Sequence, residues 1–144
     1  MGTVSVSRWG VALVLTCGAL VLASCGGDSG PKVELSEYAV SITPESVDSG
    51  ETTFSVENVG GVIHEFVVLK TDLASADLPT TDDGSVDEEG SGIEAVDEIE
   101  DITDGSSAEL TVDLETGSYV LFCNVVDGSL VHYQEGMHTS FTVE

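Results

Sequence analysis

Apolar and polar residues alternate along much of the chain after residue 32, with a period of two residues rather than the 3.6 of a helix. Clusters of Gly, Pro, Asn and Asp separate the alternating segments, as turns do. The segments are rich in Val, Ile, Phe and Tyr, which favour strands. Short strands at regular spacing predict an all-β fold, an antiparallel sandwich or barrel. We expect an extended stretch around Glu37 (residues 33–42) and strands at residues 52–57, 62–70, 109–114, 118–126 and 139–143.

One internal segment departs from this pattern. Residues 71–104 hold 13 acidic residues, no basic residue, one proline and three glycines. The segment is too long for a tight connection between strands. We interpret it as a long acidic loop insertion, with a helical turn expected at residues 72–76 and a short strand within residues 93–102.

The charge of the chain excludes some partners. There are 27 acidic and 3 basic residues, and the net charge is −24. Nucleic-acid binding is excluded because it needs a basic surface, and electrostatic binding to anionic lipid is excluded for the same reason. The acidity either keeps the protein hydrated in a salty environment or steers a basic redox partner. We expect a monomer.

The N-terminal residues have the layout of a secretion signal. One cationic residue, Arg8, precedes an apolar run over residues 11–22, which is short for a membrane-spanning helix. The following Leu-Ala-Ser-Cys25 resembles the lipobox of bacterial lipoproteins. That resemblance implies cleavage after residue 24, a lipid on Cys25 and a tether over residues 25–32, so that the protein is held on the extracytoplasmic face of the cell membrane. The alternative is an ordinary signal peptide with a chance cysteine.

Of the three cysteines, one is left without an assigned role. Cys17 leaves with the signal peptide and Cys25 is lipidated, so Cys123 is a reactive thiol, an intermolecular partner or a metal ligand. Eight residues separate Cys123 from His132, and four separate His132 from Met137; His64 lies far upstream. One thiolate, two imidazoles and one thioether suit copper in both oxidation states. They can meet only if the strands bearing His64 and Cys123 end at the same pole of the sandwich.

This pattern resembles the type 1 copper motif of the cupredoxins, the plastocyanin and azurin family, over residues 33–144. The resemblance implies a Greek-key β-sandwich with one type 1 copper per chain, held by His64, Cys123, His132 and Met137. It also implies an electron carrier rather than an enzyme, with a cytochrome or an oxidase as partner and electron passage through an exposed edge of His132. The interval from Cys123 to His132 is longer than in many small cupredoxins and is similar to that of copper nitrite reductases. Glu65 stands where many members have Asn.

Three alternatives stay open at this point. A copper chaperone or store commonly offers several Met and His residues, whereas this chain has three His and, after the signal peptide, one Met. A copper enzyme needs further His-rich sites, and no His-x-His pair is present. A copper-free structural relative would use the same residues as core. His138, directly after Met137, competes for a place as ligand.

Overall fold

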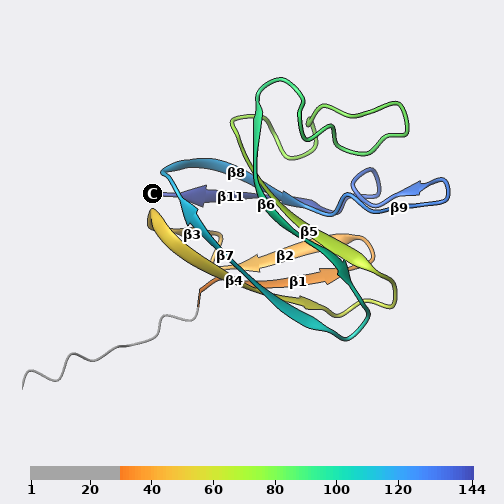
Figure 1. The fold of residues 1–144 in the computed structure, drawn as a ribbon, viewed down its shortest axis with the longest axis horizontal. Coiled ribbons are helices and arrows are strands. Elements are labelled where there is room, and N and C mark those ends of the chain that lie inside the picture. The colour runs from red at the N-terminus through yellow and green to blue at the C-terminus, as the bar shows by residue number, and fades with distance from the viewer. Residues whose placement is uncertain (1–29) are drawn as a thin grey trace, which may run out of the picture.

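The structure is a computed structural model that describes residues 30–144 (Figure 1). The predicted signal peptide over residues 1–24 and the predicted lipidation site Cys25 lie outside the described residues. Within residues 30–144, no helix has the length and apolar character needed to cross a bilayer.

The described chain folds into two packed β-sheets and a small ribbon, which confirms the predicted all-β sandwich (Figure 1). The four-stranded sheet has the order β2-β1-β4-β7, the five-stranded sheet β3-β11-β8-β5-β6, and β9 pairs with β10. Most pairings are antiparallel, but β1 runs parallel to β4 and β3 runs parallel to β11. The strands are β1 (Lys32–Ser36), β2 (Ala39–Thr43), β3 (Ser46–Val47), β4 (Gly50–Asn58), β5 (His64–Thr71), β6 (Ile93–Ile102), β7 (Ser107–Leu114), β8 (Gly117–Phe122), β9 (Val126–Asp127), β10 (Leu130–Val131) and β11 (His138–Val143).

The main core lies between the two sheets and follows the period of two. Alternate residues of β1, β2, β4 and β7 point inward, and their neighbours point to solvent. Phe54 packs against Phe66 and Phe141, with ring centroids 5.4 and 5.6 Å apart. Cys123 and Met137 belong to the same buried cluster, so the candidate sulfur ligands lie at one end of this core.

A second core covers the outer face of the five-stranded sheet. Two residues of the segment 72–92, which we call the outer-face loop, pack there, while most of this loop is exposed. Leu78 and Val86 of this loop pack with side chains of β5 and β8, in a cluster that comprises Val67, Leu69, Leu78, Val86, Val120, Phe122, Val131 and Tyr133. Both faces of β5 and β8 are therefore buried, which explains their nearly continuous apolar sequences.

Several predicted boundaries were wrong. Residues 33–42 do not form one extended stretch, because the chain turns between β1 and β2 at Glu37 and Tyr38. Residues 72–76 form no helical turn, and the backbone instead makes one tight turn in which Asp77 N–H donates to Ala74 O. The predicted strand within residues 93–102 is confirmed, but it is not short: as β6 it spans the whole range, because it pairs with the edge of β5.

Candidate metal centre

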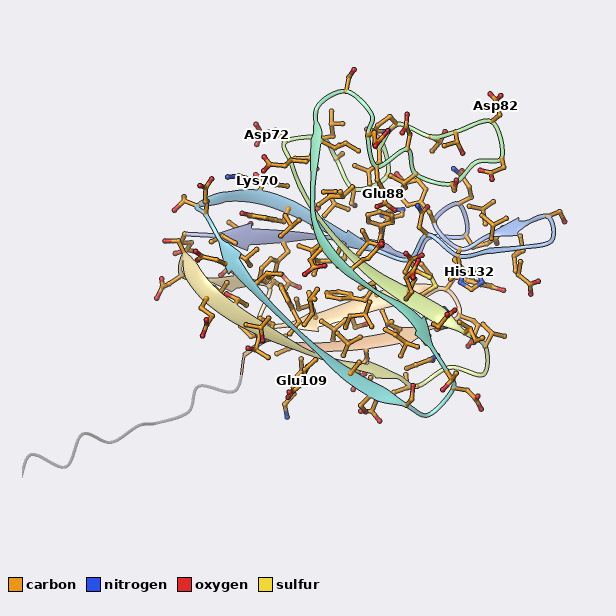
Figure 2. All side chains as sticks on the ribbon, viewed as in Figure 1. Lys70, Asp72, Asp82, Glu88, Glu109 and His132 are labelled. Carbon is orange, nitrogen blue, oxygen red and sulfur yellow. The ribbon has the colours of Figure 1, made fainter. Side chains whose placement is uncertain are left out.

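Strand pairing brings His64 and Cys123 to one end of the sandwich, as their proposed role requires. His64 is the first residue of β5, and Cys123 follows the last residue of β8. These two strands are antiparallel neighbours, with Val67 opposite Phe122, so the start of one lies beside the end of the other. His132 comes from the loop after β10, at the same end (Figure 2).

Three donor atoms converge at this end. Nδ1 of His64 and Nδ1 of His132 are 3.2 Å apart. Sγ of Cys123 lies 3.4 Å from Nδ1 of His132 and 3.9 Å from Nδ1 of His64. A triangle with these sides has a circumradius of about 2.0 Å, close to the length of a metal–imidazole bond and slightly shorter than a metal–thiolate bond. The three side chains therefore fit a single metal ion between them.

Backbone hydrogen bonds tie Met137 to both Cys123 and His132. Cys123 N–H donates to Met137 O at 3.0 Å, and Met137 N–H donates to His132 O at 3.1 Å. Gly136 has a φ of 109°, a left-handed conformation that favours glycine and lets the loop turn just before Met137. Met137 is fully buried in the core cluster that contains Cys123. The donor set fits one copper ion of type 1 character, with the thioether as its fourth member.

His138 does not join this group. Its Nδ1 contacts Ser75 Oγ at 3.0 Å, and its ring packs on Tyr133 at 5.1 Å between centroids. The side chain thus contacts the outer-face loop, not the three converging donors, so the competing ligand considered in the sequence is not part of the site as folded.

Burial sets the protonation of the candidate ligands. Burial lowers the pKa of His64, with the His132 ring as a second cause, and burial also lowers the pKa of His132. Both imidazoles are therefore neutral at pH 7 and offer lone pairs. Burial raises the pKa of the Cys123 thiol to about 11, so metal binding must displace its proton.

A backbone amide supports the thiol. Glu65 N–H donates to Cys123 Sγ at 3.3 Å, a contact that depends on the backbone and therefore does not need an asparagine at position 65. The Glu65 carboxylate points to Glu88 and Glu98, with carboxylate oxygens within 4.8 Å of one another. Burial and the contact with Glu98 raise the pKa of Glu65 to about 8, so it carries little negative charge near the sulfur at neutral pH.

Asn124 provides the side-chain support on the cysteine loop. Its Oδ1 accepts from Val86 N–H at 2.7 Å, and its Nδ2 donates to Val86 O at 3.1 Å. This two-bond pairing attaches the residue after Cys123 to the outer-face loop. The acidic insertion therefore supports the loop that follows Cys123, a role that the sequence of the insertion did not indicate.

Asn58 supports the strand that bears His64. It is fully buried, and its Nδ2 donates to Val62 O at 2.7 Å and to Ile102 O at 2.8 Å. Its Oδ1 accepts from Gly60 N–H at 2.9 Å. In the sequence, Asn58 lies between two predicted strands, where an amide that bridges strands and an ordinary turn residue look alike.

The turn between β1 and β2 covers the site. The prediction that one edge of His132 is exposed to solvent was therefore wrong. Only 1% of the His132 surface is exposed. Tyr38 packs edge-to-face on its ring, at 5.2 Å between centroids. A signal for this turn was present: the apolar positions change from odd at Val33 and Leu35 to even at Val40 and Ile42.

Comparison with known proteins identifies the fold. No family model matches the chain, and no curated protein matches it in sequence. Among solved structures, the dithionite-reduced auracyanin of the photosynthetic bacterium Roseiflexus castenholzii is 20% identical, with a TM-score of 0.54 over 78% of this chain and 94% of its own. Rusticyanin of Thiobacillus ferrooxidans is 14% identical, with a TM-score of 0.50 over 78% of this chain and 76% of its own. The chain therefore has the cupredoxin fold, as the copper motif implied.

Proposed function

We propose that this protein is a one-electron carrier that holds one type 1 copper ion through His64, Cys123, His132 and Met137. The observation that carries the proposal is the convergence of Nδ1, Nδ1 and Sγ around one point about 2.0 Å from each. When bound, copper would supply the Cu(II)/Cu(I) couple. The protein acts as a monomer, with a cytochrome or an oxidase as its redox partner.

The rigidity of the surroundings supports electron transfer. The four side chains are at most 1% exposed, and strand pairing together with buried hydrogen bonds fixes the backbones that bear them. Ligands held this way change position little when the charge of the metal changes. The reorganisation that slows electron transfer is thereby kept small.

The same burial argues against the copper-handling alternative. A chaperone or store passes its ion to an incoming ligand, which must reach the metal. Here Tyr38 packs on His132, and the side chain of His64 is 0% exposed. An incoming thiol or thioether has no direct approach to either imidazole. We therefore favour the passage of electrons over the passage of metal.

A visible absorption and electron paramagnetic resonance titration with Cu(II) tests the function. Residues 26–144 include every described strand and omit the Cys25 thiol, so they are the suitable protein. We expect an intense thiolate-to-copper band that saturates at one copper per chain. A weak spectrum without thiolate character would contradict the proposal and favour a copper-free or copper-storing role.

Replacement of Met137 by leucine is expected to raise the reduction potential while copper stays bound. The Met137 thioether would be a weak donor that stabilises Cu(II) more than an alkyl group does, and leucine conserves the buried volume at a cost below about 1.5 kcal/mol. Cyclic voltammetry of the variant and the unaltered protein measures the shift. Loss of copper from Met137→Leu would contradict the role of Met137 as a weak donor to the copper.

We also propose that Cys25 carries a lipid and holds the domain on the extracytoplasmic face of the membrane. The lipobox-like residues 22–25 and the Gly- and Ser-containing segment that follows support this location. Mass spectrometry of the mature N-terminal peptide tests it, and an unmodified Cys25 thiol would refute the anchor.

A further inference from the structure

The turn between β1 and β2 brings a carboxylate to the back of one candidate ligand. Glu37 Oε1 lies 3.5 Å from Nε2 of His64, while Nδ1 of the same ring faces Cys123 and His132. Nε2 is buried and has no hydrogen-bond partner among residues 30–144. A buried ring nitrogen without a partner is costly, and a shift of a few tenths of an ångström would complete a hydrogen bond to Glu37.

The position of the Glu37 carboxylate is itself fixed. Its Oε1 accepts from Gly61 N–H at 2.8 Å and from Val62 N–H at 3.0 Å, both in the loop that leads into His64. A Cβ on Gly60 would lie 2.6 Å from Oε1, so the loop needs glycine for the carboxylate to approach. Two backbone N–H donors on one oxygen stabilise the negative charge of this carboxylate.

We propose that Glu37 is a positioning residue for the metal centre, whose carboxylate accepts the Nε2–H of His64 and tunes the bound copper toward Cu(II). This inference rests on the proposed copper function. A histidine that ligates through Nδ1 carries its proton on Nε2, and an acceptor there fixes both the tautomer and the ring orientation. A negative charge behind the ring favours the ion of higher charge, because it increases electron donation from the imidazole.

Two substitutions separate the hydrogen bond from the charge. Glu37→Gln keeps an oxygen acceptor for the loop amides and for Nε2–H but removes the charge. We expect its ratio of Cu(II) to Cu(I) affinity to fall about tenfold, which corresponds to a potential about 59 mV higher. Glu37→Ala removes both, and we expect a further loss of Cu(II) affinity of about 10- to 100-fold.

A readout that does not need copper is the ring ¹⁵N spectrum of His64 in the copper-free protein. We expect the Nε2–H tautomer in the unaltered protein and in Glu37→Gln, and a mixture of tautomers in Glu37→Ala. Glu34→Gln is the matched control, since Glu34 is an exposed residue on β1 with the same charge. It should leave the tautomer unchanged and shift the potential by less than a third as much as Glu37→Gln.

The outcomes distinguish this inference from the function on which it rests. If the unaltered protein binds copper with a thiolate band, equal potential shifts in Glu37→Gln and Glu34→Gln would overturn the role of Glu37. An unchanged His64 tautomer in Glu37→Ala would also overturn it. If the unaltered protein shows no thiolate band, the proposed function fails, whereas the tautomer experiment still decides whether Glu37 orients His64.

Discussion

The Cys123→Ser variant is expected to lose the thiolate-to-copper band completely and to bind Cu(II) far more weakly. The band requires charge transfer from a sulfur ligand, and a serine hydroxyl is a hard donor that does not ionise at neutral pH. Among residues 30–144, Cys123 is the free thiol, and no second sulfur anion could replace it there. Absorption spectra of the two proteins at one equivalent of Cu(II) measure the effect.

The fold should survive this substitution. Serine is close to cysteine in size, and its hydroxyl oxygen can accept the Glu65 N–H that now reaches Sγ. We expect a loss in the free energy of unfolding of about 1 kcal/mol. Met137→Leu is the comparison variant, because it alters the same site yet keeps the thiolate and hence the band. A full-intensity band in Cys123→Ser would assign the charge transfer to some other group and refute the ligand set.

The Asn58→Asp variant is expected to lower the free energy of unfolding by about 4 kcal/mol. The side-chain amide donates to Val62 O and Ile102 O, and the substitution places a carboxylate oxygen against these two carbonyl oxygens in a fully buried site. Both carbonyls lose their partner, and a charge is buried without a counterion. Chemical denaturation of the copper-free protein measures the change.

Gln134→Glu is the matched control for Asn58→Asp. It makes the same exchange of an amide for an acid, and Gln134 is exposed, with one hydrogen bond to Gly84 O. Its effect should stay within about 0.5 kcal/mol. If both variants lost similar stability, the added charge and not the buried hydrogen bonds would explain the result.

Since the Asn58 bonds hold the loop before His64, Asn58→Asp should also weaken copper binding.

The donor types of the metal centre could be predicted from sequence because they are properties of single residues. The spacing of Cys123, His132 and Met137 keeps three of them within one local segment, which any fold must bring near a single strand end. The role of His64 was harder to predict from sequence, since the distance between His64 and Cys123 depends on strand pairing. The antiparallel neighbours β5 and β8 supplied that contact and confirmed the expectation that both strands end at the same pole.

The surroundings of the metal centre were not predictable in the same way. Glu37 and Tyr38 lie in a turn that reaches His64 and His132 only because β1 pairs with β4 and because β2 folds back on β1. The burial of His132 follows from that contact. The outer-face loop, which we interpreted from composition as part of a long acidic loop insertion, is attached to the sheet because two of its apolar residues, Leu78 and Val86, contact the apolar outer face of β5 and β8.

The sequence by itself therefore determined the strand periodicity, the class of fold and the chemistry of the candidate ligands. These depend on side-chain type and on local spacing, which the chain carries at every stage of folding. The tertiary structure decided which residues surround the candidate ligands. Glu37 lies behind His64, and Tyr38 packs on His132. Asn58 and Asn124 hold the segments next to His64 and Cys123 through hydrogen bonds. Such contacts join residues that are distant in the chain, and the pairing and packing of whole sheets bring them together.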